Sequence, residues 1–282
     1  MKNSLNHTIN LAGRLIDLST PKVMGILNIT PDSFYDGSRY LKEEDIEKRI
    51  LQLINDGADF IDIGGCSTRP GSYSPSPEEE WSRISLGLKL LSAISPGFPA
   101  SVDTFRSEIT IKAVELYGPV IINDISGGNL DKKMWDTVAE LKVPYVLSHM
   151  RGAPENMDSF CEYKDVVSEV ITELSWKLNE LFRKGVCDVI IDPGFGFAKT
   201  IDQNFKILAE LQEFIKMDQP LLVGVSRKSM IYKTLGISPQ DSLCGTVALD
   251  TVALMKGANI LRVHDVKESV EIVKLVNIMN SV

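Results

Sequence analysis

Short apolar runs recur along the chain, and each is followed by a polar, often glycine-rich stretch and then by a segment with helical spacing. Short runs rich in Val, Ile and Leu, bounded by turn residues, are typical of buried strands. The runs predict eight strands, near residues 23–28, 60–63, 100–103, 120–123, 145–149, 189–192, 221–225 and 260–264.

The segments between these strands favour helices. In residues 43–58, "EEDIEKRILQLINDGA", apolar residues stand at positions 46, 50, 53 and 54, and Gly57 is a typical stop signal. A second segment, residues 163–186, ends near Gly185. Its apolar stripe consists of Val166, Val170, Leu174, Leu178 and Leu181.

Strands that alternate with helices over this length predict an α/β fold, a single (β/α)8 TIM barrel over residues 21–282. A doubly wound open sheet is the main competitor, but no glycine-rich dinucleotide fingerprint follows the first predicted strand. Residues 1–20 precede the barrel, and we interpret them as an N-terminal extension, a small hairpin that can cover the bottom of the barrel.

The composition of the 282 residues is that of a soluble globular protein, with 44% hydrophobic and 24% charged residues. The net charge of -8 argues against a nucleic-acid partner, because such proteins are usually basic. Four scattered cysteines without a CxxC pair favour free thiols in a reducing cytoplasm. No signal peptide or membrane-spanning segment is visible. We therefore expect a cytoplasmic protein with no membrane partner.

Polar residues gather where each predicted strand ends. In a (β/α)8 barrel these carboxyl ends meet at the active-site face. In chain order the strands lead into Asn28, "DIGGCSTRPGS", "SVDT", "INDISGG", "SHMRGAP", "DPGFGFAKT", "GVSRKS" and "LRVHDV". Helix caps would explain some of these polar ends. Polar ends on all eight strands predict a functional site.

Seven of these stretches, in this order, resemble the dihydropteroate synthase family: "MGILNITPDSFYDG", "DIGGCSTRPGS", "SVDT", "INDISGG", "DPGFGFAKT", "GVSRKSMI" and "LRVHDV". The resemblance runs from about residue 22 to residue 270, and seven motifs together are far more specific than one. It implies condensation of 6-hydroxymethyl-7,8-dihydropterin pyrophosphate with 4-aminobenzoate. The products would be 7,8-dihydropteroate and pyrophosphate, in folate biosynthesis.

A pterin presents an edge rich in N–H donors, so its recognition needs buried acceptors at rigid positions. Asp103, Asn123 and Asp192 each end a predicted strand and can supply them, Asp192 by a two-point carboxylate contact. Lys228, just after the seventh strand, can donate to the 4-oxo and N5 acceptors of the ring. Asp103 and Asp192 would also fit caps or turns, and this alternative stays open.

The pyrophosphate needs positive charge. Side chains alternate along a strand, which puts Arg262 and His264 on one face as a cationic clamp, and Arg69 can close over it. The resemblance implies that Asn28 holds Mg2+ bound to the pyrophosphate, because Mg2+ takes few protein ligands besides substrate phosphates. The loop after Asn28 would also fit a solvated loop with Asx-turns. The residues expected to be catalytic are Asp103, Lys228, Arg262 and His264.

The resemblance assigns the 4-aminobenzoate slot to Thr68, Pro70, Phe197, Lys228 and Ser229. Phe197 would form an aromatic wall, and Ser229 with the following helix N-terminus would receive the carboxylate. The arylamine is neutral at pH 7, so catalysis would rest on positioning and leaving-group stabilisation. The sequence departs from the family pattern, in ways that bear on the shape of this slot, at Cys66, Ala198 and Gln203.

Two other functions stay open. A methyltetrahydrofolate-binding corrinoid methyltransferase shares the pterin site but needs no pyrophosphate clamp, so "TPDSF", "SRKS" and "RVHD" favour the synthase. A non-catalytic pterin-binding homologue would be expected to lose Asn28, Lys228 or Arg262, which are all present. The family is usually dimeric, so the resemblance also implies a homodimer.

Overall fold

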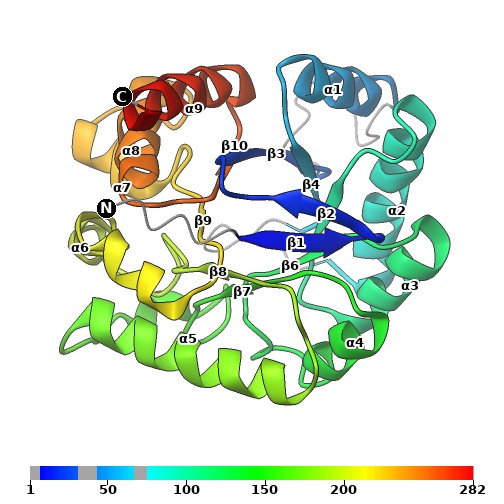
Figure 1. The fold of residues 1–282 in the computed structure, drawn as a ribbon, viewed down its shortest axis with the longest axis horizontal. Coiled ribbons are helices and arrows are strands. Elements are labelled where there is room, and N and C mark those ends of the chain that lie inside the picture. The colour runs from blue at the N-terminus through cyan, green and yellow to red at the C-terminus, as the bar shows by residue number, and fades with distance from the viewer. Residues whose placement is uncertain (1–6, 31–42, 67–74, 282) are drawn as a thin grey trace.

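The computed structural model describes residues 7–30, 43–66 and 75–281. In this part of the chain, eight parallel strands form one sheet in the order β8-β7-β6-β5-β4-β3-β10-β9. A parallel bridge between Ile191 and Leu221 joins its two ends, so the sheet closes into a barrel (Figure 1). The strands are β3 (Lys22–Asn28), β4 (Phe60–Gly64), β5 (Ala100–Asp103), β6 (Ile121–Asp124), β7 (Tyr145–Ser148), β8 (Val189–Asp192), β9 (Leu222–Val223) and β10 (Ile260–Val263). The predicted (β/α)8 barrel is confirmed.

Helices surround the barrel on its outside (Figure 1). They are α1 (Glu43–Asn55), α2 (Pro77–Ile94), α3 (Ser107–Tyr117), α4 (Met134–Leu141), α5 (Val166–Arg183), α6 (Ile201–Ala209), α7 (Ser229–Leu235), α8 (Leu243–Met255) and α9 (Val266–Ser281). Two 3-10 helices, η1 (Met157–Phe160) and η2 (Leu211–Met217), lie in the connections. The apolar stripe predicted for α5 is buried along its whole length, because it covers the outer face of the barrel.

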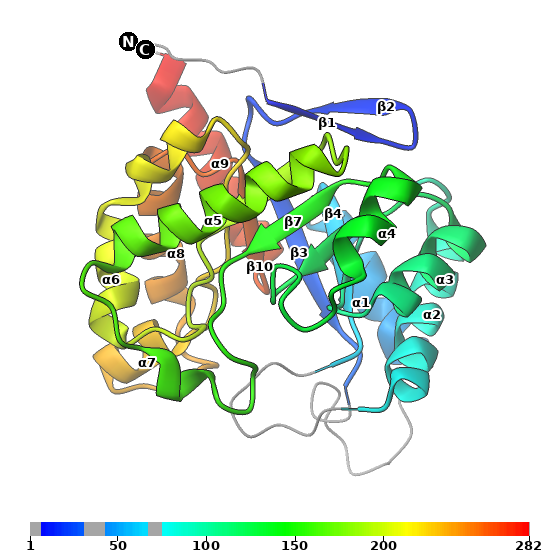
Figure 2. The ribbon, with the colours of Figure 1, turned by 90° about the horizontal axis from the view of Figure 1, so that it is seen from below.

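An antiparallel hairpin precedes the barrel. It consists of β1 (Thr8–Leu11) and β2 (Arg14–Asp17), and its tight turn contains Gly13 at a φ of 80°. Ile9 and Leu11 are buried against the barrel's interior residues. Figure 2 shows the hairpin lying across the end of the barrel at which the strands begin. The hairpin therefore shields the bottom of the barrel from water.

The interior of the barrel is layered. Its bottom layer is apolar and consists of Ile9, Leu11, Leu18, Met24, Phe60, Ile121, Val146, Ile190, Leu222 and Ile260. Two residues further along, on the same faces of five strands, stand Asp62, Asn123, Ser148, Asp192 and Arg262. Because side chains alternate along a strand, this spacing stacks a polar layer directly above the apolar one. The lower layer stabilises the barrel by burying apolar side chains, and the upper layer carries polar groups that can bind a ligand.

Strand β9 is shorter than the sequence predicts. The apolar run predicts residues 221–225, whereas the ladder contains only Leu222 and Val223. The chain leaves the ladder because it enters a turn, in which the N–H of Lys228 donates to the carbonyl of Val225 at 3.1 Å. Val225 lies outside the strand, but its side chain is buried, which explains why the apolar run continues to this position.

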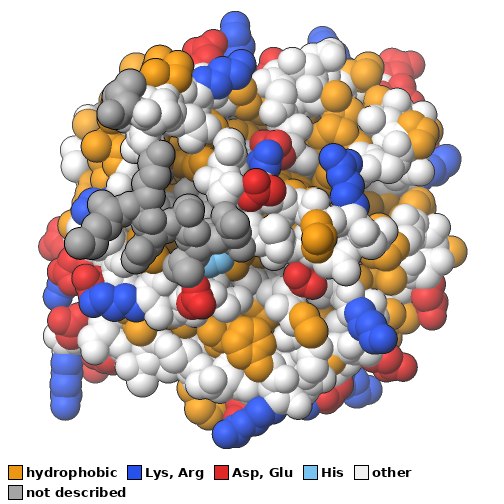
Figure 3. Space-filling model, viewed as in Figure 1, with side chains coloured by type: hydrophobic (Ala, Val, Ile, Leu, Met, Phe, Trp, Pro, Cys, Tyr) orange, Lys and Arg blue, Asp and Glu red, His pale blue; other side chains and the backbone are white. Residues whose placement is uncertain are grey.

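None of the described helices is long and apolar enough to cross a membrane. On the face that the hairpin covers, Lys and Arg side chains are interspersed with Asp and Glu (Figure 3). Mixed charges of this kind partly cancel, so this face is not strongly charged in one sense.

Candidate functional site

Polar side chains from four strands join across the barrel's interior. The carboxylate of Asp62 on β4 accepts a hydrogen bond from Asn123 Nδ2 at 3.0 Å and another from Arg262 Nε at 2.6 Å. Arg262 Nη2 donates to Asp103 Oδ2, also at 2.6 Å. Since β4 is separated from β10 by β3 and from β6 by β5, the bonds to Asp62 pass through the interior. Three predicted site residues therefore meet around Asp62.

Asp62 is a residue of this network that the sequence motifs do not predict. Its side chain is fully buried, and its Oδ1 has no hydrogen-bond partner within residues 7–30, 43–66 and 75–281. A buried polar atom without a partner is unusual and indicates a ligand contact. A signal was present in the sequence, because Asp62 is a charged residue two positions after the inward-facing Phe60.

Asp103, the last residue of β5, has a perturbed carboxyl group. Burial and the neighbouring carboxylates of Asp62 and Asp124 raise its pKa to about 7, although Arg262 and Lys228 act in the opposite direction. Its carboxylate bonds Arg262, and the residue at the N-cap of α3 is Arg106. The alternative that Asp103 serves as a helix cap is therefore wrong.

Asp192 and Lys228 lie close together on the other side of this interior. Asp192 Oδ1 accepts the N–H of Gly194 at 2.8 Å, so the turn predicted as an alternative is present. Its Oδ2 accepts the hydroxyl of Ser148 at 3.3 Å. Burial lowers the pKa of Lys228 to about 8, and its charge interacts with Asp192, Arg262 and Asp103. The charge of Lys228 is therefore felt by both carboxylates, Asp192 and Asp103.

His264 differs from the expected cationic partner of Arg262. Its Nδ1 lies 3.1 Å from the hydroxyl oxygen of Ser226. Burial and the positive charge of Arg262 lower the pKa of His264 to about 3. The imidazole is therefore neutral at pH 7 and offers a hydrogen bond instead of a second positive charge. This corrects the prediction of a doubly charged clamp.

The residues expected to bind 4-aminobenzoate are found together in part. The ammonium of Lys228 lies 4.6 Å from the centre of the Phe197 ring, within the range of a cation–π interaction. Ser229 follows Lys228 and begins α7. Thr68 and Pro70 lie outside the described residues, as does Arg69 of the predicted pyrophosphate clamp.

Asn28 ends β3 beside a space that a side chain would fill. A Cβ atom added at Gly64 would lie 3.2 Å from Asn28 Oδ1 and 3.5 Å from Asp103 Cβ. An amide oxygen is a hard ligand of the kind that Mg2+ binds, and the glycine leaves room beside it. Among the described residues, no three His, Cys, Asp or Glu side chains form a metal site. The residues present fit a Mg2+ ion held by Asn28 and substrate oxygens.

A strained turn carries Lys228 into the site. The preceding residue, Arg227, has a φ of 55°, a left-handed conformation that costs a residue with a side chain about 1–2 kcal/mol. Two contacts hold it: Arg227 Nε donates to Asp265 Oδ2 at 3.0 Å, and its backbone N–H donates to Thr246 Oγ1 at 3.1 Å. Strain of this kind is often found where a functional side chain must be aimed.

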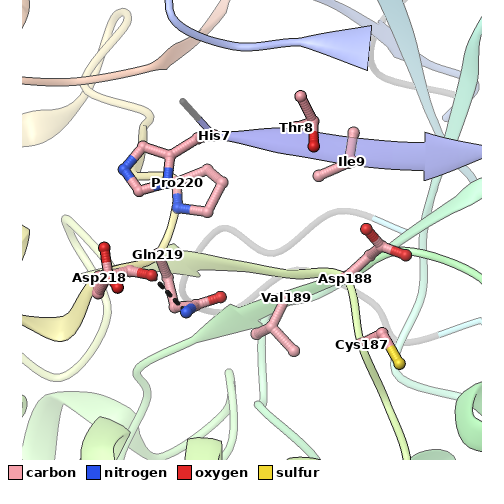
Figure 4. A pocket seen from close by; sticks show the side chains of 9 residues that line it. All are labelled: His7, Thr8, Ile9, Cys187, Asp188, Val189, Asp218, Gln219 and Pro220. Carbon is pink, nitrogen blue, oxygen red and sulfur yellow. Dashed lines mark hydrogen bonds between the residues drawn. The ribbon is translucent and has the colours of Figure 1, made fainter. Parts of the chain in front are cut away.

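A separate pocket opens at the opposite end of the barrel. Its volume is about 320 Å3, and Figure 4 shows His7, Asp188 and Asp218 among its lining residues. It lies beside the start of β8 and contains none of the predicted site residues. The candidate site is therefore the polar layer at the carboxyl ends of the strands.

The chain is similar to known proteins over almost its whole length. Residues 24–264 match the family model described as pterin binding enzyme. Dihydropteroate synthase of Escherichia coli K12 is 41% identical over 268 residues, covering 94% of this chain and 93% of that protein. Among solved structures, dihydropteroate synthase of Xanthomonas albilineans with 4-aminobenzoic acid superimposes with a TM-score of 0.91 at 38% identity, covering 98% and 99% of the two chains.

A second structure of the Xanthomonas albilineans enzyme, in complex with 7,8-dihydropteroate, superimposes with a TM-score of 0.87 at 35% identity and covers 98% of this chain and 99% of its own. Identity at this level over the full barrel, together with the family match, shows common ancestry as well as a common fold. The chain belongs to the dihydropteroate synthase family of pterin-binding enzymes.

Proposed function

We propose that the polar layer of this barrel joins 6-hydroxymethyl-7,8-dihydropterin pyrophosphate to 4-aminobenzoate, giving 7,8-dihydropteroate and pyrophosphate. The observation that carries the proposal is the hydrogen-bonded set Asn123–Asp62–Arg262–Asp103, with which the charge of Lys228 interacts. It combines acceptors for a pterin edge with a rigidly held cation for an anionic leaving group. Relatives solved with 4-aminobenzoic acid and with 7,8-dihydropteroate support this choice of substrate and product.

The pterin is assigned to the buried carboxylates. Asp103, Asn123 and Asp192 would accept or share hydrogen bonds with the N–H groups of the ring, and Asp62 Oδ1 adds a buried acceptor. Lys228 would donate to the ring's 4-oxo and N5 atoms. The low polarity of the layer beneath strengthens each of these bonds, because little water is present to compete.

The pyrophosphate is assigned to Arg262 and His264. Asp62 and Asp103 take two of the five N–H donors of the guanidinium, which fixes its orientation, and the phosphoryl oxygens take other donors. Neutral His264 would donate through its second ring nitrogen. Asn28 would hold Mg2+, which when bound neutralises charge on the leaving group. Arg69 would make a further contact with the phosphate groups.

The arylamine of 4-aminobenzoate needs no base to activate it, because it is neutral at pH 7. Phe197 would hold the ring beside the exocyclic carbon of the pterin, and Ser229 with Lys228 would receive the carboxylate. Thr68 and Pro70 are assigned to the same slot. When the C–O bond to the pyrophosphate breaks, the new C–N bond forms, and the nitrogen then loses its proton to water. Catalysis thus consists of positioning and stabilisation of the leaving group.

The proposal is tested with the purified chain and both substrates. Dihydropteroate and pyrophosphate should form in a 1:1 ratio, and omission of either substrate should abolish both products. Release of pyrophosphate without dihydropteroate, or no turnover by a folded protein that binds pterin, would overturn the proposal. The second outcome would leave a non-catalytic pterin-binding protein.

We also propose a homodimer. The neighbouring helices α8 and α9 carry large exposed apolar side chains, Met255 at 61% and Leu275 at 66% exposure. Burial of such side chains favours association. Light scattering should give twice the mass of one chain, and a monomeric mass at micromolar concentration would refute the dimer.

A further inference from the structure

Lys199, in the loop between β8 and α6, is a buried lysine that belongs to none of the groups assigned above. Its side chain is 8% exposed. The Nζ atom lies 2.9 Å from the carbonyl oxygen of Gly194, 3.0 Å from that of Phe197 and 3.0 Å from His149 Nδ1. An ammonium has three N–H donors, so these acceptors match its capacity. The contacts bind the side chain of Lys199 to its own loop.

The partners of Lys199 also determine the orientation of His149. Burial lowers the pKa of Lys199 to about 7. The protonated form of Lys199 only donates, so His149 Nδ1 accepts from it and the ring proton is assigned to Nε2. Nε2 lies 3.0 Å from Glu173 Oε2 on α5. Burial and the charge of Lys199 lower the pKa of His149 to about 4, which agrees with a neutral ring. A chain of hydrogen bonds thus runs from Glu173 through His149 and Lys199 to the loop carbonyls.

The loop depends on such contacts because its backbone is irregular. Gly194, Gly196 and Ala198 all have left-handed φ angles, of 73°, 79° and 49°. Side chains hold its polar groups instead: the amide oxygen of Asn204 accepts the N–H of Gly196 at 2.7 Å, and the hydroxyl of Tyr163 donates to the carbonyl of Ala198 at 3.0 Å. Lys228 donates to the carbonyl of Phe195.

The contacts of Lys199 determine the position of Phe197. Its backbone carbonyl accepts from Lys199, while its ring lies under the ammonium of Lys228. Lys199 thus fixes the backbone from inside the loop, at a residue whose ring faces the ammonium of Lys228. By contrast, the pterin-assigned Asp192 belongs to β8, and its Oδ2 accepts the hydroxyl of Ser148, which Lys199 does not contact.

We propose that Lys199 is a positioning residue, which with His149 and Glu173 behind it holds Phe197 in place and thereby sets the affinity for 4-aminobenzoate. This inference rests on the proposed function, in which Phe197 walls the 4-aminobenzoate slot. Lys199 touches no substrate. Its removal should therefore affect one substrate far more than the other.

The first test is Lys199→Met, which keeps the length of the side chain and removes the donors. Because small displacements of a positioning group are costly, KM for 4-aminobenzoate should rise about tenfold or more, and KM for the pterin pyrophosphate should change less than about threefold. Lys177→Met is the matched control, since Lys177 is equally buried and donates to the carbonyl of Ser126 at 3.3 Å. The control should leave both KM values within about threefold.

A second pair of variants covers the case in which Lys199→Met does not fold. His149→Asn keeps an acceptor near the position of Nδ1, whereas His149→Gln keeps a donor near the position of Nε2. The proposal expects the Asn variant to retain the wild-type KM for 4-aminobenzoate and the Gln variant to raise it. The reverse order, or an equal rise in both KM values for Lys199→Met, would overturn the proposal.

A readout without turnover separates this inference from the proposed function. Hydrogen exchange of a peptide covering residues 193–200 should be faster in Lys199→Met or His149→Gln than in the wild type, with other peptides unchanged. Unchanged exchange in this peptide would refute the positioning role of Lys199, even if the enzyme is active. If the wild type forms no dihydropteroate, the proposed function fails. Faster exchange in the Lys199→Met variant would still show that Lys199 holds the loop in place.

Discussion

Arg262 Nε lies 2.6 Å from Asp62 Oδ2, across the inside of the barrel from β10 to β4. The same guanidinium reaches Asp103 at the same distance with Nη2. A partly buried arginine that donates to two carboxylates has little freedom to turn, so its remaining donors point in a defined direction. The barrel therefore holds an oriented cation, which the proposed function assigns to the leaving group.

Asp62→Asn should disturb both this orientation and the fold. The amide keeps the size of the carboxylate, but Asn123 and Arg262 both donate to Asp62, and the new NH2 group opposes one of them. Because breaking one partner of a buried pair is costly, the free energy of unfolding should fall by about 3 kcal/mol in urea denaturation.

The control is Asp59→Asn. Asp59 pairs with Lys22 at 3.3 Å near the surface, and both side chains are partly exposed. Loss of this pair should cost less than about 1 kcal/mol. Equal losses at positions 59 and 62 would show that the interior network is no more than a surface-like contact.

Arg262→Ala and Lys228→Ala should weaken different parts of the substrate. Loss of Arg262 should raise the Kd of the pterin pyrophosphate about tenfold more than that of the bare pterin, because a charge-assisted contact is lost only with the phosphates. Loss of Lys228 should weaken both ligands by similar factors, since it serves the ring. Titration calorimetry with the two ligands measures this, and the same pattern in both variants would contradict the assignment.

Pterin binding should follow a bell-shaped pH dependence. In the proposed function the Asp103 carboxylate accepts a hydrogen bond from the pterin ring, so affinity should rise as pH increases through about 7, where Asp103 loses its proton. Affinity should fall again above about 8, where Lys228 loses the proton it donates. Because these groups interact, the two limbs belong to the set of groups.

Variants at the two residues separate the limbs. Asp103→Asn should lack the rise at low pH, and Lys228→Arg should lack the fall at high pH, because arginine stays protonated. The Kd of bare pterin, measured by fluorescence across the range, decides this. A profile that both variants share with the wild type would assign the titration to the ligand itself.

Arg227 offers a test of strain against function. Arg227→Ala and Arg227→Gly both lose the ion pair with Asp265, but only glycine accepts the φ of 55° without cost. The glycine variant should therefore be more stable than the alanine variant by about 1 kcal/mol.

The activity of the Arg227→Gly variant should nonetheless be lower than that of Arg227→Ala. Glycine makes the backbone of the turn more flexible, so the turn orients Lys228 less well. Thermal unfolding and kcat, measured on the same preparations, give both quantities. Activity that tracks stability across the two variants would mean that the turn has no role in aiming Lys228.

Much of the fold follows from local sequence signals. The apolar runs at 100–103 and 189–192 coincide with β5 and β8, because those strands are buried on both faces and end at a charged residue. The run at 221–225 predicts too long a strand, because a residue can be buried without pairing in a sheet. Val225 is buried in a turn.

The site is less predictable because it depends on contacts between distant strands. The alternation of side chains along a strand predicts that Arg262 faces inward. It does not predict that the carboxylates of Asp62 on β4 and Asp103 on β5 accept hydrogen bonds from the guanidinium. Asp62 lies within an apolar run, where the sequence pattern predicts a core strand and no functional residue. The neutral state of His264 comes from burial next to Arg262, and sequence spacing carries no measure of burial.

The chemical step itself gives the most direct test of the central claim, that the oriented Arg262 stabilises the departing pyrophosphate. Single-turnover formation of dihydropteroate is followed by rapid quench, with the enzyme in excess and 4-aminobenzoate saturating. In Arg262→Ala the rate constant should fall at least about 100-fold, the size expected for loss of a preorganised charge contact, while the Kd of bare pterin stays within about threefold. A rate constant within about threefold of the wild type would contradict the account.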